Sequence, residues 1–221
     1  MDPVDLTRRL EPGMPVYPGD PGVTAEQSAT METDGYRVTR LSFTTHAGTH
    51  IDAPAHMEPA GATLDEYDVG AFRFDARVVD LSGGGAADAL GAREAIVPEH
   101  VPDPAAVDEG TDMLVLRTGW GSRWGEVSYL DHPYLAPRTA ARIVDLGCAV
   151  GLDTINPDPT PTDRAGADEP EGVPAHRELL GAGEFVVENL RLPDRLPERF
   201  TLRAYPLRVD ADGAPVRAVA E

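Results

Sequence analysis

The sequence contains no lysine: all 19 of its basic residues are arginine, against 38 acidic residues, and the formal net charge is −19. A field of this sign repels nucleic acid and anionic lipid, so we expect neither a nucleic-acid partner nor a membrane partner. Repulsion within so acidic a domain is relieved by screening in concentrated salt, which predicts a halophilic protein. An acidic protein from a GC-rich genome is the alternative, which explains the missing lysine better than the excess of acid.

The sequence also has one cysteine and no long apolar run. Cys148 cannot form an internal disulfide, and it lies in an apolar stretch, so we expect a small core residue and not a reactive thiol. The apolar runs fall far short of the roughly 20 residues that span a bilayer. Residues 1–5 are acidic and lack the apolar region of a signal peptide, which predicts a cytoplasmic location.

The length of 221 residues suits a single domain, and we expect residues 1–221 to form one. Strand patterns dominate, at residues 37–45, 76–81, 113–118, 149–154, 184–190 and 199–209. Two helices are expected, over residues 137–146 before Gly147 and over residues 175–180 ending at Gly181. This balance predicts an α/β fold that is sheet-rich, barrel-like or layered, with a few flanking helices. The proline- and acid-rich residues 156–172 are either a mobile excursion or a lid near a site.

Residues 45–56 are the segment richest in candidate catalytic and metal-binding side chains, and they hold three of the six histidines. It follows a strand pattern, so we place it at the end of a strand that continues into a loop. His50 and Asp52 are two residues apart and point to the same side of an extended chain, and His46 joins them if the backbone turns at Gly48. Two imidazoles and one carboxylate predict a metal site with a position left open for water.

His56 lies just beyond this group, close enough to reach the open position without being forced to coordinate the metal. We therefore interpret His56 as the proton-transfer residue of a hydrolase. The alternative is that all four side chains are ordinary polar residues. The close spacing of three histidines around one aspartate argues against it.

Two later residues are further candidates. Glu188 interrupts an apolar strand pattern, where an unpaired carboxylate is costly to bury. It is either a metal ligand or a solvent-facing residue of an edge strand. His176 opens the second expected helix and is either a ligand or a helix-surface residue. His100 and His132 lie beside prolines and acids in loop-like sequence, and we predict surface positions for both.

Other catalytic signatures are missing from the sequence. It has no His-Glu-x-x-His helix, no Gly-x-Ser-x-Gly elbow, no Gly-x-Gly-x-x-Gly turn and no paired cysteines. Covalent catalysis therefore has no visible candidate, and activation of water by a metal is the remaining route.

Residues 46–56, His-Ala-Gly-Thr-His-Ile-Asp-Ala-Pro-Ala-His, resemble the H-x-G-T-H-x-D-x-P-x-H signature of the metal-dependent cyclase superfamily. This superfamily includes bacterial kynurenine formamidase (arylformamidase) and isatin hydrolase, and all seven fixed positions are present. The resemblance extends over nearly the whole chain, through residues 15–20, 116–120, 151–154, 188–190 and 215–218.

The resemblance implies a swivelling β/β/α fold and one or two divalent ions per subunit, with zinc as the first choice and manganese as the second. The implied metal ligands are His46, His50, Asp52, His176 and Glu188. Asp52 and Glu188 would contact both ions, and His56 would donate and accept protons. Family members are commonly homodimers or homotetramers, which implies a homo-oligomer.

Tyr17 lies in the segment that resembles the family's N-terminal substrate loop, so it is the implied substrate-binding residue; formamidases usually carry tryptophan there. The implied enzyme is a metal-dependent amidohydrolase that acts on C–N bonds other than peptide bonds in a small-molecule substrate. N-formylkynurenine, cleaved to kynurenine and formate in tryptophan catabolism, is the expected substrate. Isatin-type lactams, cyclic imides and a polyketide-type cyclisation are alternatives within the enzyme class.

A non-catalytic metal-binding protein is the alternative from another class. His56 argues against it, because a structural metal site is coordinatively closed and needs no proton-transfer residue beside it.

Overall fold

The computed structural model describes residues 2–84 and 88–221, and its body is a closed barrel of seven strands. The barrel strands are β4 (His50–Asp52), β5 (Arg73–Asp80), β7 (Met113–Arg117), β9 (Ala149–Leu152), β10 (Val186–Glu188), β11 (Arg199–Pro206) and β12 (Gly213–Ala220). Their order is β12-β11-β5-β7-β9-β10-β4, and β4 pairs back onto β12, which closes the barrel. The short β1 (Val4–Asp5) pairs with the end of β12. Closure satisfies the strand edges within one chain.

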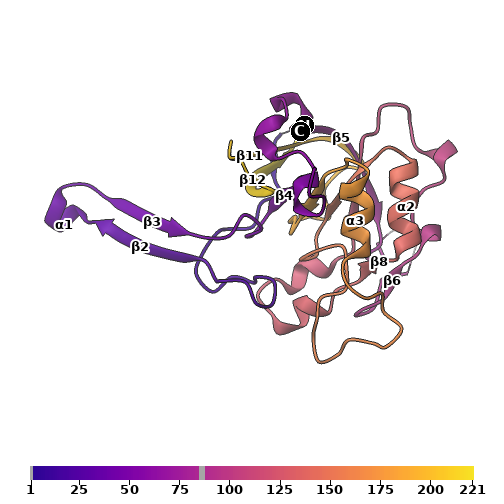
Figure 1. Cartoon of the computed structure of the whole chain (residues 1–221), viewed down its shortest axis with the longest axis horizontal. Coiled ribbons are helices and arrows are strands. Elements are labelled where there is room, and N and C mark those ends of the chain that lie inside the picture. Colours follow the sequence, from indigo (N-terminus) through magenta and orange to yellow (C-terminus); the bar gives the residue numbers. More distant parts are fainter. Residues whose placement is uncertain (1, 85–87) are drawn as a thin grey trace.

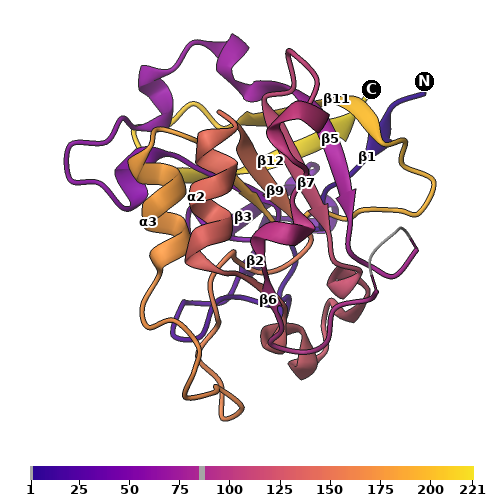
Figure 2. The same ribbon diagram turned by 90° about the vertical axis from the view of Figure 1, so that its right-hand side faces the viewer.

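Two helices cover one side of the barrel. Strands β5, β7, β9 and β10 run parallel, and parallel neighbours need crossover connections. The crossovers carry α2 (Pro137–Asp145), which precedes β9, and α3 (Pro174–Gly181), which precedes β10. The two helices lie side by side over the outer face of the sheet (Figure 2). This cover explains why β7 is buried on both faces and has a continuous apolar sequence.

The apolar residues form two main layers. Alternate strand residues, such as Phe74 and Ala76 of β5 and Leu202 of β11, point into the barrel and fill it. The other set, including Leu114, packs outward against Ile143 and the rest of the helical face. Each layer follows from the two-residue period of the strands.

A hairpin projects from this body (Figure 1). It consists of β2 (Thr24–Ala29), the single helical turn α1 (Met31–Asp34) and β3 (Val38–Ser42), and we call residues 24–42 the arm. Thr30 caps α1 through a hydrogen bond from the backbone N–H of Thr33, and Gly35 ends the turn at φ +76°, a conformation that glycine adopts without strain.

The remaining elements are short. β6 (Ala95–Ile96) and β8 (Tyr134–Leu135) pair in parallel. Single-turn 3₁₀ helices occupy Pro54–His56, Leu64–Glu66, Val69–Phe72, Pro98–His100, Pro104–Ala106, Trp120–Arg123 and Val127–Asp131. Among residues 2–84 and 88–221, no helix is long and apolar enough to cross a membrane.

The sheet-rich α/β fold with few helices is confirmed. Every strand expected from pattern overlaps an observed strand, although β5 begins three residues before the predicted start at residue 76, and both expected helices are present within one or two residues of their predicted bounds. Two differences stand out. The strand expected at residues 37–45 lies in the arm and not in the barrel, and β12 was missed because its small residues and Pro215 are not typical of strands. Cys148 is a buried core residue as predicted, and burial raises the pKa of its thiol to about 11.

Candidate metal centre and active site

β4 presents two of the candidate ligands on one side. Ile51 points into the barrel core, so its neighbours His50 and Asp52 point to the outer face. Antiparallel pairing places Glu188 of β10 opposite His50, and residues that face each other across a ladder share a side of the sheet. The register of β4 and β10 therefore gathers three candidate ligands: the imidazole of His50 and the carboxylates of Asp52 and Glu188.

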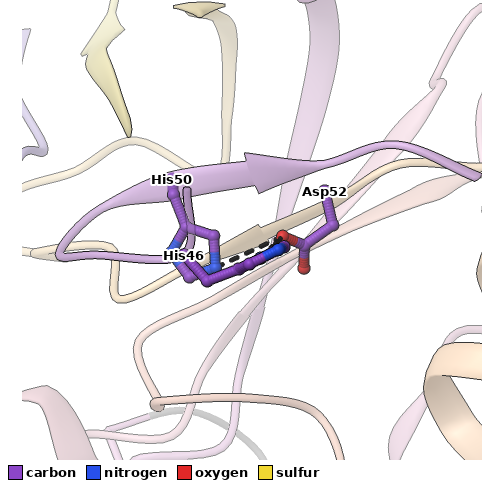
Figure 3. A group of neighbouring side chains, drawn as sticks. All are labelled: His46, His50 and Asp52. Carbon is purple, nitrogen blue, oxygen red and sulfur yellow. Dashed lines mark hydrogen bonds and ion pairs between the residues drawn. The ribbon is translucent and has the colours of Figure 1, made fainter. Parts of the chain in front are cut away.

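His46 joins this group through the turn that was expected at Gly48. Gly48 has φ +66°, and the reversal brings Nδ1 of His46 to 2.7 Å from Oδ1 of Asp52 (Figure 3). Gly213 of β12 lies directly against the ring, because a Cβ there would stand 2.7 Å from Cε1 of His46. A side chain at position 213 would displace the His46 ring.

His176 approaches from α3, and Asp158 holds it. The carboxylate of Asp158 accepts hydrogen bonds from the backbone N–H groups of Ala175 and His176 at 2.8 and 3.0 Å, which satisfies the first turn of α3. It also accepts from Nδ1 of His176 at 2.7 Å. Because a carboxylate only accepts, Nδ1 donates to Asp158, and in the protonated ring Nε2 donates to Oε1 of Glu188 at 3.1 Å; a metal bound at Nε2 would displace that second proton.

The five side chains form two overlapping groups of ligand atoms. His46, His50 and Asp52 make one, and Asp52, His176 and Glu188 make the other; the ligand atoms within each lie within 4.8 Å of one another. Nε2 of His50 and Oδ2 of Asp52 are buried without a hydrogen-bond partner among the described residues. Unpaired buried polar atoms are costly, and a divalent cation would satisfy both. The residues therefore fit a metal centre of one or two ions.

The electrostatics of the cluster also favour a cation. Burial lowers the pKa of His50, but Asp52 and Glu188 outweigh burial and raise that pKa well above its ordinary value. Burial raises the pKa of Asp52, but His50, His176 and His46 hold that pKa well below its ordinary value. The carboxylates are therefore ionised at neutral pH, and a metal that binds there displaces protons from the imidazoles.

A hydrogen-bond bridge orients His50. The carbonyl oxygen of Gly48 accepts from Nδ1 of His50 at 2.9 Å and from the side-chain amide of Asn189 at 2.9 Å. Asn189, at φ +57°, follows Glu188 directly, and its amide oxygen accepts from the buried hydroxyl of Tyr129 at 2.8 Å. The bridge ties the His50 turn to the end of β10 and leaves Nε2 of His50 directed at the cluster.

His56 lies beside the cluster and contacts a carboxylate that is not part of it. Its ring centroid is 4.0 Å from that of His46. Oδ2 of Asp212 accepts from Nδ1 of His56 and from Nε2 of His46, both at 3.0 Å. These hydrogen bonds hold the pKa of Asp212 well below its ordinary value. The bond from His46 has the largest effect, and burial acts in the opposite direction. His46, His56 and Asp212 form a third group of closely spaced ligand atoms.

A cavity of about 290 Å³ opens onto the five candidate metal ligands and His56. Tyr17, from the N-terminal loop, lines it as the sequence led us to expect. Apolar side chains form much of the remaining wall, namely Val16, Met57, Ile155 and Val173. The cavity combines an apolar wall with a few convergent polar groups, which is typical of small-molecule sites.

The predicted residues thus come together, and sequence reasoning missed three of their supports. Asp158 and Asp212 lie in segments that resemble ordinary loops, and no local pattern marks them; Asn189 lies in the expected strand at residues 184–190, where nothing local points to its role beside His50. Only the tertiary contacts reveal them. The solvent-facing alternatives for Glu188 and His176 are excluded, because both residues are buried.

One prediction about the histidines was wrong. His132 is buried and not on the surface, because Nε2 pairs with Thr160 at 2.8 Å and Nδ1 donates to the carbonyl of Pro133 at 2.8 Å. His100 is half-buried.

Residues 156–172 form part of the site wall. Asn156 lines the cavity, and Arg93 binds the loop through Glu169 and the carbonyl of Thr160. The first part of the loop, residues 156–160, is therefore packed against the body, whereas most of residues 161–172 are exposed.

Relatives of known name share nearly the whole chain. A kynurenine formamidase from Paracidovorax citrulli is 32% identical over 97% of this chain and 94% of its own. One from Geobacillus thermodenitrificans is 32% identical over 97% of this chain and 95% of its own.

Solved structures agree with this relationship. Isatin hydrolase A from Labrenzia aggregata superposes with a TM-score of 0.82 at 27% identity, over 99% of this chain and 92% of its own. A predicted metal-dependent hydrolase from Bacillus stearothermophilus superposes with a TM-score of 0.75 at 25% identity, over 99% and 97%. The model of the cyclase family, described as putative cyclase, matches residues 4–159, and the chain belongs to that family.

Proposed function

We propose that this protein is a metal-dependent amidohydrolase whose substrate is N-formylkynurenine, cleaved to kynurenine and formate. The observation that carries the proposal is a pair of buried atoms, Nε2 of His50 and Oδ2 of Asp52, which have no hydrogen-bond partner among the described residues and lie next to a cavity that also holds His56. The kynurenine formamidase relatives, similar over 97% of the chain, support the same chemistry.

Five residues hold the metal in this proposal: His46, His50, Asp52, His176 and Glu188. A bound divalent ion would polarise a carbonyl as a Lewis acid and would lower the pKa of a bound water toward neutral pH. Zinc is the first choice and manganese the second, because both accept imidazole and carboxylate ligands. Asp52 belongs to both ligand groups, which suits a bridging role if two ions bind.

His56 moves the proton. Asp212 accepts from Nδ1 of His56, which fixes the tautomer and leaves Nε2 with no hydrogen-bond partner among residues 2–84 and 88–221. Nε2 is therefore free to take a proton from water and to deliver it to the departing nitrogen of the amide. Asp212 orients the ring.

The cavity suits a compact substrate. At about 290 Å³ it lies near the lower limit of typical ligand pockets, which matches a molecule of one aromatic ring and a short chain. We assign Tyr17 to the ring of the substrate, since it is the aromatic side chain on the cavity wall.

A lactam of the isatin type is the second candidate, because isatin hydrolase A superposes with a TM-score of 0.82. Both candidates require attack of water on a carbonyl bonded to nitrogen, so the same residues serve either. Cyclic imides and polyketide-type cyclisation follow as further substrates to screen.

The test is hydrolysis of N-formylkynurenine by the purified protein, with zinc or manganese added in turn and a chelator control. Metal-dependent turnover with kcat/KM above about 10⁴ M⁻¹s⁻¹, the lower end of typical enzymes, supports the proposal. Tight metal binding without turnover of this substrate removes the kynurenine assignment, and isatin is then assayed in the same way. Metal binding with no turnover of any of these compounds favours the non-catalytic alternative.

Several further properties belong to the same proposal. Residues 1–221 act as one catalytic domain of the swivelling β/β/α type, in the cytoplasm, as a homodimer or homotetramer. The net charge of −19 suits a salt-rich environment, where counterions screen the repulsion. Urea unfolding at low and molar KCl tests the last point, and a free energy of unfolding that does not change with salt would remove it.

A further inference from the structure

Residues 17–20, Tyr-Pro-Gly-Asp, form a tight turn at the cavity. The backbone N–H of Asp20 donates to the carbonyl oxygen of Tyr17 at 3.0 Å, and Gly19 has φ +101°. Proline at the second position and a glycine of positive φ at the third are typical of a type II turn, whose first and fourth Cα atoms lie within about 7 Å of each other. Tyr17 and Asp20 both line the cavity. The turn therefore presents an aromatic ring and a carboxylate to the same space.

Two other polar side chains of the cavity wall are engaged within the chain. Nδ2 of Asn156 donates to Oγ1 of Thr160 at 2.8 Å, and its amide oxygen accepts from the backbone N–H of Asp158 at 2.7 Å. Asn189 is held through both ends of its amide by the bridge that orients His50. Both amides therefore serve to hold the wall in place.

Asp20 differs from these amides because its carboxylate is not engaged. It forms no ion pair and accepts no side-chain hydrogen bond among residues 2–84 and 88–221. It belongs to none of the three groups of closely spaced ligand atoms. The chain has no lysine, and no arginine lines the cavity in the described part of the chain. The wall therefore offers a partner to a cationic group, whereas an anionic group finds no basic side chain apart from the histidines.

The charge of the whole molecule acts in the same direction. The formal net charge is −19, and the field of a strongly charged protein raises the local concentration of ligands of opposite sign. An ammonium group on a substrate is attracted by this field, and a carboxylate is repelled. Both the local and the long-range charges thus favour an amine at the cavity.

We propose that Asp20 binds the ammonium group of an amine-bearing substrate while Tyr17 contacts its aromatic ring, and that no side chain binds a carboxylate of that substrate. The inference rests on the proposed function for the reaction and narrows its substrate class to aryl formamides with an amine on a short chain. In N-formylkynurenine the ammonium group is separated from the ring by three carbon atoms, a reach of roughly 5 Å. This reach matches two side chains at opposite ends of one turn, and the carboxylate then faces solvent.

Asp20 also distinguishes between the two candidate substrates. Isatin has an aromatic ring and two carbonyl groups but no ammonium group, so its binding gains nothing from Asp20. A ligand that covers a charged group without pairing with it costs binding free energy, whereas an amine-bearing formamide keeps the carboxylate paired. We therefore expect Asp20 to favour the formamide over the lactam.

Calorimetric titration of the metal-loaded protein tests the amine subsite without requiring turnover. The ligands are kynurenine, its analogue without the α-amino group and its analogue without the carboxylate. The wild type should bind the two amine-bearing compounds with similar affinity, and the deaminated compound at least about 5-fold more weakly. In Asp20→Asn, which keeps the shape of the side chain, the two amine-bearing compounds should lose this advantage and the deaminated compound should bind as in the wild type.

Steady-state kinetics gives a second readout. Asp20→Asn should raise KM for N-formylkynurenine about 5-fold with little change in kcat, because the ammonium group is remote from the amide that reacts. Asp20→Glu keeps the charge and should keep the preference for amines. Asp163→Asn removes the same charge from an exposed position that does not line the cavity, and it should leave all affinities unchanged.

The two assays distinguish failure of this inference from failure of the proposed function. Preference for amines that depends on Asp20, without hydrolysis of N-formylkynurenine, removes the proposed substrate and keeps the amine subsite. Hydrolysis of N-formylkynurenine with the same KM in Asp20→Asn keeps the proposed function and removes the subsite. Equal affinity of the wild type for the three ligands, or no detectable binding of any of them, would also overturn the inference.

Discussion

The metal cluster and the arm stand at opposite extremes of the same chain. Asp52 and His50 are almost fully buried, and each is held by the register of a closed barrel. The arm is held by one turn cap and by the pairing of its own two strands. The barrel can hold buried polar atoms without a hydrogen-bond partner among the described residues in place on its outer face, because many other contacts determine its shape, whereas the arm has no such surplus. The candidate metal site and the arm therefore lie in regions of different rigidity.

The strongest test of the rigid region is Asp52→Ala. We expect loss of metal binding and turnover at background, because Asp52 belongs to both ligand groups. Metal content by mass spectrometry and calorimetric titration would measure the effect. Asp20→Ala is the matched control, since Asp20 lines the cavity without belonging to a ligand group, and it should keep its metal. Normal metal affinity in Asp52→Ala would contradict the assignment.

His56→Ala should separate catalysis from metal binding in the same region. We expect kcat to fall about 10²–10⁴-fold with the metal retained, because a proton-transfer residue contributes in this range. Steady-state kinetics on a metal-loaded sample would check it. Near-normal turnover would remove His56 from the mechanism.

One substitution made in both regions compares their packing directly. Leu202→Ala in β11 should lower the free energy of unfolding by about 2–5 kcal/mol, because it empties part of the barrel core. Leu41→Ala in the arm should change it by no more than about 0.5 kcal/mol at low protein concentration. Urea unfolding at two protein concentrations would measure both. Equal effects of the two variants would contradict the contrast.

Asp212→Asn should show how far the support of His56 matters. The change keeps the shape of the side chain but removes the negative charge that orients and stabilises the ring. We expect kcat to fall about 10–100-fold, with an altered pH profile and little change in KM. A pH profile identical to that of the wild type would show that Asp212 does not act through His56.

The smallest expected effect concerns His132, which is buried behind the site. Burial lowers the pKa of His132 to about 4, whereas an unfolded histidine has a pKa near 6.5. Between these values the unfolded chain binds a proton that the folded chain does not, so stability falls as pH drops from about 6.5 to about 4. We expect a contribution on the order of 1 kcal/mol, absent in His132→Gln. Chemical unfolding at a series of pH values would show it, and parallel curves for the two proteins would refute it.

The local sequence was enough to predict four of the residues that cluster around the cavity, namely His46, His50, Asp52 and His56. Spacing placed His50 and Asp52 on one side of a strand, and Gly48 indicated the turn that brings His46 to them. Glu188 and His176 remained open by pattern alone, because a carboxylate or an imidazole at a strand or helix position is compatible with solvent. Resemblance to a family assigned them, and their burial in the structure excludes the solvent-facing alternatives.

The expected position of His132 was wrong for a related reason. Proline and acid neighbours are typical of surface loops. His132 is nevertheless buried, because Nε2 of its ring pairs with the hydroxyl of Thr160, which lies 28 residues away in the sequence. Separation in sequence also hid Asp158 and Asp212, which contact His176 and His56 from 18 and 156 residues away, in segments without any regular pattern.

The sequence by itself determined the alternation of the strands, the helix ends at glycine, the acidic charge and the spacing of the first three ligand candidates, because these depend on neighbours within a few residues. Only the tertiary structure decided which strands close the barrel, that residues 38–42 leave it to form the arm, and which carboxylates orient His56 and His176. Those outcomes depend on contacts between residues far apart in the chain, whose energies are set by packing and burial and leave no periodic trace in the sequence.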